Sequence, residues 1–462
     1  MNYSDAIAFL YDLRWFGAKL GLSNTLKLAA LAGDPHHKLR FIHVAGTNGK
    51  GSTCAMLESI YRAAGLRVGL FTSPHLVRFN ERLQVNRHPI PEHDLIRLVS
   101  EMRSFLLQGW AASPALDETQ ATNSLIHQST NPSIHQSVNP PIPQSNPAHP
   151  TFFEVVTVLA LRYFAEQQCE LVVWETGLGG RLDATNIVTP SASIITNIQF
   201  DHQEWLGHTL TSIAAEKGGI IKPGVPVITG TEAPEALEVI RTIAREKNAP
   251  LRVVSKAEAQ APPLDTLRLP LLGQHQKRNA AVALAAVRTL ASRIAVSEQN
   301  IRAGLTRLDW PGRLQVISRA SGQQILLDGA HNPGGAHALA AAIREVSPGA
   351  EPTLILGMLG DKDWAAMCEI LAPLARRILL VPVQSQRSAA PLELAAVCRR
   401  ANPAAHILEF DSLSAAFSAT ADDPLVVVAG SLYLVGEALE LLRLSPGSGS
   451  RERDLNEWTA RR

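Results

Sequence analysis

A glycine-rich turn near the N-terminus constrains the fold of this chain more than any other feature. Residues 46–52 read Gly-Thr-Asn-Gly-Lys-Gly-Ser, after a β-rich run at 39–45 and before a helical pattern at 52–64. A second short strand is expected at 67–71. Strand, glycine turn, helix and strand in this order form a βαβ unit, which predicts a parallel sheet covered by helices.

Similar units recur along the chain. Helical patterns are expected at 4–16, with Ser4 as N-cap, and at 152–167 and 279–293, with strands at 171–175, 192–198 and 226–229. A second α/β series follows Trp310, with strands near 324–327, 353–356, 377–381 and 425–429. Because 462 residues exceed one ordinary core, we predict two domains, 1–309 and a smaller α/β domain at 310–462.

One segment departs from this pattern. Residues 123–145 repeat an eight-residue unit rich in Pro, Asn, Gln and Ser, and three such copies cannot build a core. We expect residues 112–150 to be a disordered surface insertion without catalytic importance. Its histidines, His127 and His135, are explained better by repetition than by metal binding.

Composition narrows the range of partners. The chain has 43 Lys plus Arg and 42 Asp plus Glu, a net charge of +1, which gives no support to a nucleic-acid or membrane-surface partner. No stretch approaches the roughly 18 apolar residues of a membrane span, and no signal peptide is recognised. The four cysteines are far apart in sequence, which favours reduced thiols over a disulfide framework or a zinc site. We therefore expect a cytoplasmic protein.

The turn at 46–52 has the residues of a phosphate site. Backbone N–H groups at a helix start favour anions, Lys50 adds a positive charge, and the hydroxyl of Ser52 can bind magnesium. The motif departs from the usual G-x-x-x-x-G-K-[ST] pattern, because Val44 replaces its first glycine and Gly51 separates Lys50 from Ser52. The alternative is an ordinary glycine turn that caps a βα unit. Lysine and hydroxyl together favour phosphate binding.

Polar residues follow the next predicted strands at the same edge of the sheet. Ser73 and Glu175 offer oxygen ligands to a hard cation, and His202 could contact metal or phosphate. Each also has a structural alternative, such as capping for Glu175. The residue types alone do not decide whether Lys217 or Lys222 belongs to the site. A buried lysine that loses its proton could take up CO2 as a carbamate.

Other candidates are weaker individually. His75 could contact a substrate anion, and Arg313 could clamp phosphate oxygens at the domain junction. In the second half Asp328 and His331 follow a strand, and Ser431 could hold a small polar substrate.

Together these residues resemble one family, the folylpolyglutamate synthase/dihydrofolate synthase branch of the Mur-ligase-like ATP-dependent amide ligases. The matching stretches run in the family's order from about residue 40 to 436: HVAGTNGKGS, FTSPHL, ETGLGGRLDATN, DHQEWLG, AAEKGGIIKPG, GQHQKRNAAVAL, WPGRLQ, DGAHNP and GSLYLVG. The resemblance implies a P-loop-type, mostly parallel sheet in an ATPase domain, followed by a smaller α/β domain. The form G-T-N-G-K-G-S is the one this family uses.

The resemblance also implies roles for individual residues. ATP would be bound by Thr47, Asn48, Gly49, Lys50, Gly51, Ser52, Asn279, Arg313 and Asp328. Mg²⁺ would be bound by Ser52, Ser73, Glu175, His202 and Lys217, the last matching a carbamylated position. Lys50, His202 and Lys217 would be catalytic, and His75, His331 and Ser431 would contact substrate.

The implied reaction phosphorylates the carboxylate of a pterin or folate and joins the acyl phosphate to L-glutamate, with release of ADP and phosphate. We expect a monomer. Two alternatives remain. A cell-wall ligase of the same superfamily would need an extra N-terminal domain of order a hundred residues, for which the loop at Gly46 leaves no room. A non-catalytic nucleotide-binding regulator would not need Lys50 and Arg313 together with the metal-ligand candidates.

Overall fold

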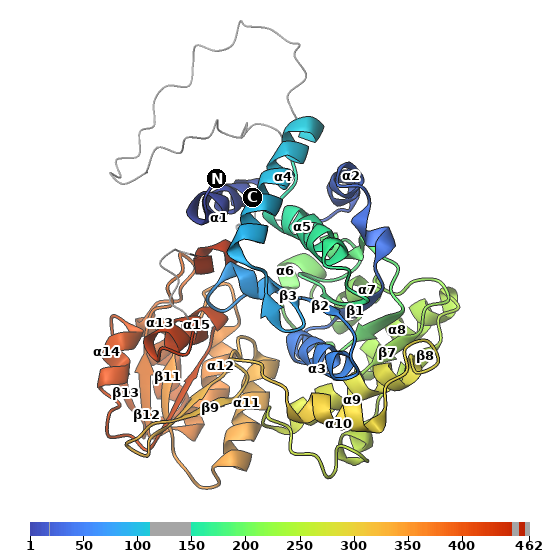
Figure 1. The fold of residues 1–462 in the computed structure, drawn as a ribbon. Coiled ribbons are helices and arrows are strands. Elements are labelled where there is room, and N and C mark those ends of the chain that lie inside the picture. The colour runs from blue at the N-terminus through green and yellow to red at the C-terminus, as the bar shows by residue number, and fades with distance from the viewer. Residues whose placement is uncertain (18, 111–148, 446–451, 458–462) are drawn as a thin grey trace, which may run out of the picture.

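Two β-sheets, each covered by helices, lie side by side in this chain (Figure 1). The computed structural model describes residues 1–17, 19–110, 149–445 and 452–457. The insertion expected at 112–150 lies outside these residues except for His149 and Pro150. His149 is buried and stacks on Phe16, with ring centroids 4.1 Å apart.

The first sheet has eight strands in the order β4-β3-β2-β5-β1-β6-β7-β8. All neighbouring pairs are parallel except β2 with β3 and β3 with β4, so the prediction of a mostly parallel sheet is confirmed. The strands are β1 (Phe41–Ala45), β2 (Val68–Phe71), β3 (Leu83–Val85), β4 (His88–Pro89), β5 (Leu171–Glu175), β6 (Ala192–Ile195), β7 (Val227–Thr229) and β8 (Leu251–Val253).

Alternation along the central strands divides the core of this half into two layers. In β5, Leu171 and Val173 face one layer of helices, and Val172 and Trp174 face the other. The first layer contains α3 (Lys50–Ala63), α9 (Gln274–Thr289) and α10 (Glu298–Thr306). The second contains α1 (Tyr3–Asp12), α2 (Ser23–Leu31), α4 (Glu92–Trp110) and α5 (Phe152–Glu166), and is continued by α6 (Gln203–Leu206), α7 (Leu210–Gly218) and α8 (Pro234–Glu246).

The second sheet has six strands in the order β13-β12-β11-β14-β10-β9, all parallel except β9. They are β9 (Gln315–Ser318), β10 (Gln324–Leu327), β11 (Thr353–Leu356), β12 (Arg377–Leu380), β13 (His406–Glu409) and β14 (Leu425–Ala429). One face is covered by α11 (Pro333–Val346), α12 (Trp364–Leu371) and α13 (Pro391–Ala401), and the other by α14 (Leu413–Ser418) and α15 (Leu432–Leu441). The predicted division after residue 309 falls between α10 and β9 and stays a prediction.

Two helix starts differ from the prediction. Asn2, not Ser4, caps α1, because its side chain accepts a hydrogen bond from the Asp5 N–H (2.9 Å) and the Asp5 carboxylate accepts one from the Asn2 N–H (2.9 Å). That helix ends at Asp12, and Leu13–Phe16 forms a 3₁₀ turn. α9 begins at Gln274, which places Asn279 in its second turn. Among the described residues, no helix is long and apolar enough to cross a membrane.

Candidate active site

A cavity of about 1310 Å³ lies where the carboxyl ends of the first sheet's strands face loops of the second sheet. It explains why residues far apart in sequence can act together, since parallel strands bring their C-terminal loops to one edge. All the predicted site residues but one line it: Thr47, Asn48, Gly49, Lys50, Gly51, Ser52, Ser73, Glu175, His202, Lys217, Asn279, Arg313, Asp328, His331 and Ser431.

The glycine-rich loop joins β1 to the start of α3. α3 begins at Lys50, earlier than expected, so Lys50 and Ser52 both lie in its first turn. Lys50 Nζ donates to the carbonyl oxygens of Gly46 (3.1 Å) and Thr47 (3.3 Å), which brings the ammonium group over its own loop. Gly49 has φ +81°, and a Cβ there would lie 2.4 Å from Asn279 Oδ1, so only glycine fits. The loop thus has the turn, the helix start and the cation of a phosphate site.

Glu175 ends β5 and is almost fully buried. Burial raises its pKa to about 7, although Lys50, the Ser73 N–H and Arg313 act in the opposite direction. Its Oε2 accepts a hydrogen bond from the Ser73 N–H (3.1 Å). With Ser52, Ser73 and His202, which also line the cavity, the donor set is rich in oxygen and includes a buried carboxylate that a cation would ionise. These residues fit Mg²⁺.

Lys217 extends from α7 into the same region. Its side chain is buried, and its Nζ donates to the Gly46 carbonyl (3.0 Å). Burial and the nearby Lys50 lower its pKa to about 7, so a substantial neutral fraction is present at physiological pH. Lys222, which the sequence did not distinguish from it, does not line the cavity and donates instead to the Asn186 carbonyl (3.0 Å).

On the side of the cavity formed by the second sheet, Asp328 directly follows β10. Its two oxygens accept hydrogen bonds from the N–H groups of Leu314 and Ala330 (both 2.9 Å), and burial raises its pKa. The guanidinium of Arg313 lies nearby in a partly buried position, and the loss of solvent around it lowers its pKa. His331 Nδ1 donates to the Gly329 carbonyl (2.8 Å), so Nε2 carries the lone pair. Burial and Lys362 lower the His331 pKa to about 4, and the ring is neutral at pH 7.

Comparison with known proteins decides the family. Residues 312–432 match the family described as Mur ligase, glutamate ligase domain. The chain is 34% identical to folylpolyglutamate synthase of Lacticaseibacillus casei, over 96% of this chain and 99% of that one. It is 33% identical to dihydrofolate synthase/folylpolyglutamate synthase of Bacillus subtilis, with the same coverage. This chain belongs to the folylpolyglutamate synthase/dihydrofolate synthase family.

The family fold is also the fold of this chain. The structure of Escherichia coli FolC in complex with DHPP and ADP superposes with a TM-score of 0.78 at 32% identity, over 96% of this chain and 98% of that one. The expected α/β architecture with a second, smaller sheet is therefore confirmed.

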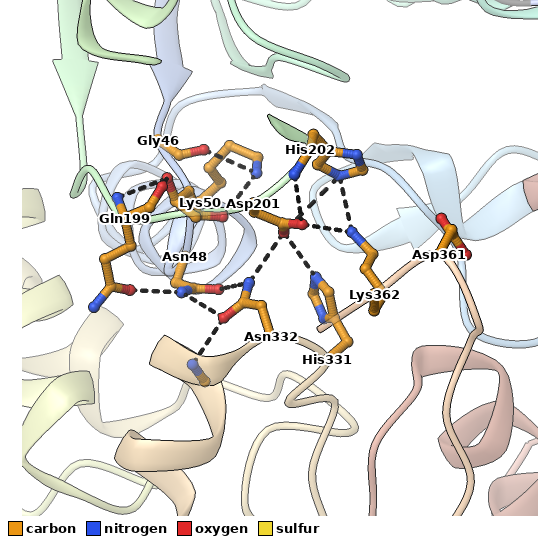
Figure 2. A network of polar contacts seen from close by, with 12 residues as sticks. Gly46, Asn48, Lys50, Gln199, Asp201, His202, His331, Asn332, Asp361 and Lys362 are labelled. Carbon is orange, nitrogen blue, oxygen red and sulfur yellow. Dashed lines mark hydrogen bonds and ion pairs between the residues drawn. The ribbon is translucent and has the colours of Figure 1, made fainter. Parts of the chain in front are cut away.

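A polar network joins the two halves at the cavity (Figure 2). Asp201, in the loop after β6, accepts hydrogen bonds from Lys362 Nζ (2.6 Å) and Asn332 Nδ2 (3.0 Å), both from the second half. Asn332 also exchanges hydrogen bonds with Asn48 of the glycine-rich loop (3.0 and 3.1 Å). Burial by itself would raise the pKa of Asp201, but Lys362, His202 and His331 reverse this and hold it well below its usual value.

His202 borders this network. Its backbone N–H donates to Asp201 Oδ1 (2.9 Å), and Lys362 Nζ lies 3.3 Å from its Nε2. Burial lowers its pKa to about 3, so the imidazole is neutral and able to bind a metal ion.

His75 is the predicted site residue that the structure does not bring to the cavity. The ring is buried, its Nδ1 accepts a hydrogen bond from Arg82 Nε (2.9 Å), and its Nε2 donates to the Glu452 carbonyl (2.9 Å). Both ring nitrogens are engaged, so neither is available in this structure for the expected contact with a substrate anion. His75 supports the C-terminal segment instead.

Several cavity residues escaped the sequence analysis. Lys362 follows β11 at the carboxyl edge of the second sheet, and Asn332 caps α11. A charged residue after an apolar strand could have marked Lys362, as it marked Glu175. The same signal could have marked Arg387, which follows β12 at a similar distance, whereas Glu457 follows no strand.

Proposed function

We propose that this chain is an ATP-dependent ligase that phosphorylates the carboxylate of a pterin or folate substrate and joins it to L-glutamate, releasing ADP and phosphate. One observation carries the proposal: a single cavity is lined by the glycine-rich loop of the first sheet and by Asp328, His331 and Ser431 of the second. Membership of a family that contains folylpolyglutamate and dihydrofolate synthases, and a relative that binds DHPP and ADP, support it.

The loop at the start of α3 would bind the ATP phosphates. Thr47, Asn48, Gly49, Lys50, Gly51 and Ser52 would surround them, with Asn279, Arg313 and Asp328 on the other parts of the nucleotide. When the substrate carboxylate attacks the γ-phosphate, negative charge spreads over the transferred group. Lys50 and Arg313 would stabilise that charge in a buried site, where fixed cations act strongly.

Ser52, Ser73, Glu175 and His202 would hold Mg²⁺. The bound ion would neutralise charge on the transferred phosphoryl group. Their hydroxyl, carboxylate and imidazole groups suit this role, and Glu175 would ionise beside a cation in spite of its burial.

Lys217 would act as a carbamate. Its neutral amine would add to CO2, form an N–C bond and release one proton, which converts the neutral amine into an anionic ligand. A pKa of about 7 supplies the neutral amine that this reaction needs. Added bicarbonate is expected to raise activity at pH 7, and Lys217→Arg, which keeps its proton, is expected to be inactive and insensitive to bicarbonate. Equal activity in CO2-depleted and bicarbonate buffers would contradict the carbamate.

Residues of the second half would position glutamate. His331 is neutral, and its Nε2 can accept a hydrogen bond from the amino acid's amine, while Ser431 would contact the same substrate. The neutral amine attacks the acyl carbon, the amide C–N bond forms, and phosphate leaves as the amine loses its proton. Holding both reactants in one cavity supplies the orientation that the step needs. We also propose that the enzyme is a cytoplasmic monomer.

The test is glutamate-dependent ADP release with Mg-ATP, with dihydropteroate and tetrahydrofolate in separate reactions. We expect turnover with at least one pterin and its loss in Lys50→Ala, and the active pterin identifies dihydrofolate synthase, folylpolyglutamate synthase or both. Turnover only with other carboxylates would favour a different Mur-type amino-acid ligase. ATP binding without turnover would favour a non-catalytic regulator.

A further inference from the structure

The C-terminal segment Glu452–Glu457, here called the C-terminal strap, lies between the two halves of the chain. On the first-sheet side, Glu452 is fully buried and accepts hydrogen bonds from the Tyr3 hydroxyl (3.0 Å) and the Phe79 N–H (2.7 Å). Asn456 Nδ2 donates to the His75 carbonyl (3.0 Å). These contacts fix the strap to the N-terminal half.

The same strap is fixed to the second half by its other side chains. Arg453 pairs with Glu440 of α15 and donates to Gln384 Oε1 (2.9 Å). Glu457 accepts a hydrogen bond from Arg387 Nε (2.9 Å). The strap is therefore a second connection between the halves, separate from the network around Asp201.

The end of the strap forms part of the cavity wall. Glu457 lines the cavity together with Arg387, Tyr433 and Ser431, and only 7% of Glu457 is exposed. One carboxylate oxygen is bound by Arg387, and Oε1 has no hydrogen-bond partner among the residues that the structure describes. A buried carboxylate with one unsatisfied oxygen is costly, and a structural residue would normally have both satisfied.

Arg387 is held in place by other residues. Its Nη1 donates to Asp361 Oδ2 (3.0 Å), which lies outside the cavity wall, and its Nη2 donates to the Tyr433 hydroxyl (3.3 Å). The Tyr433 N–H in turn donates to Ser431 Oγ (3.1 Å) at the start of α15. The guanidinium is thus positioned at the cavity wall whether or not Glu457 is bound, and a fixed guanidinium binds carboxylates well.

We propose that Arg387, with Tyr433, binds a carboxylate of the incoming amino acid, and that Glu457 occupies this place as an internal carboxylate until the amino acid displaces it. The inference rests on the proposed function. It assigns a place in the cavity to one carboxylate of that amino acid, a group chemically the same as the one it replaces. Arg387 therefore keeps a carboxylate partner throughout, and the strap competes as an intramolecular ligand at high effective concentration.

Competition predicts changes of opposite sign in two variants. Glu457→Gln keeps the shape but removes the competing charge, so the KM for glutamate is expected to fall by about threefold to tenfold. Arg387→Met removes the binding group, so the same KM is expected to rise by at least about tenfold. The KM for ATP should change less than about twofold in both. In the double variant, Glu457→Gln should have no further effect.

Two further variants distinguish competition by Glu457 from a general effect of losing a negative charge and from a change in the position of Arg387. Glu393→Gln makes the same charge change on the exposed side of α13 and should leave the KM for glutamate unchanged. Asp361→Asn removes the residue that positions Arg387, so it should raise that KM rather than lower it. Thermal unfolding of each variant checks that the fold is kept. An unchanged or raised KM in Glu457→Gln, or an equal loss for ATP and glutamate in Arg387→Met, would refute the subsite.

A direct measurement of glutamate binding tests the Arg387 subsite separately from the proposed ligase activity. L-Glutamate is titrated calorimetrically into the full chain in the presence of a non-hydrolysable ATP analogue. Tighter binding by Glu457→Gln and loss of binding by Arg387→Met would support the subsite even in a protein that turns over no pterin. Identical binding by parent and both variants would refute it even if the parent is an active folate ligase.

Discussion

Replacing Glu175 by glutamine should stabilise the metal-free protein while removing its activity. Burial raises the Glu175 pKa to about 7 from an ordinary value of 4.5, which corresponds to a cost of about 3 kcal/mol for keeping the carboxylate ionised in the fold. Between these values the folded protein binds a proton that the unfolded chain has released. The free energy of unfolding therefore falls as pH rises through about 4.5 to 7, and the full cost is present above that range.

Glutamine keeps the shape of the side chain and an oxygen for the Ser73 N–H, but it has no charge to bury. We expect Glu175→Gln to exceed the parent in unfolding free energy by about 3 kcal/mol at pH 8 and to equal it at pH 4.5 or below. Urea unfolding with EDTA present, followed by circular dichroism, measures this difference. Glu246→Gln, an exposed change on α8, serves as control and should show no pH-dependent difference.

The same variant should lose Mg²⁺-dependent ADP release, because a neutral amide replaces an anionic ligand. A Glu175→Gln protein that is no more stable than the parent at pH 8 would refute the reasoning, since the carboxylate would then carry no burial cost. A gain of equal size at both pH values would show that the change acts through packing rather than charge.

Two further predictions concern the cavity walls. Asp201→Asn leaves Lys362 buried without its ion-pair partner (2.6 Å), so urea unfolding should show a loss of about 3 kcal/mol, part of which Lys362→Met restores in the double variant; strictly additive losses would contradict the pairing. Gly49→Ala combines left-handed strain with a Cβ 2.4 Å from Asn279 Oδ1, so the KM for ATP should rise at least about tenfold. Gly65→Ala has a similar φ of +90° with nothing within 4 Å and should leave that KM unchanged, and equal effects in both variants would show that strain alone is responsible.

The central strands were predictable because their signal is local. Continuous apolar runs mark β5, β10, β11 and β14, which are buried on both faces, and each was predicted within a residue or two. The strands at the edges of the sheets, β4, β8, β9 and β13, were not predicted. None of their residues is buried, so each lacks the buried apolar run that reveals a central strand.

The residues of the site likewise divide into those with a local sequence signal and those without one. Lys50 and Glu175, at the ends of central strands of the first sheet, could be placed at one edge from the sequence, since its parallel strands all end there. His75 also follows a strand, but its ring does not line the cavity, because its two nitrogens are engaged by Arg82 and the C-terminal strap. Which way a side chain turns depends on neighbours that are distant in sequence.

The sequence by itself determined the mostly parallel sheet, the glycine-rich turn at its edge and the family, because strand patterns and a glycine-rich helix start are properties of neighbouring residues. Only the tertiary structure decided how the halves meet. The pairing of Asp201 with Lys362 joins residues 161 positions apart, one in each half. Such contacts form only after both sheets have packed, and no local pattern encodes the energy of burying a charge beside its partner.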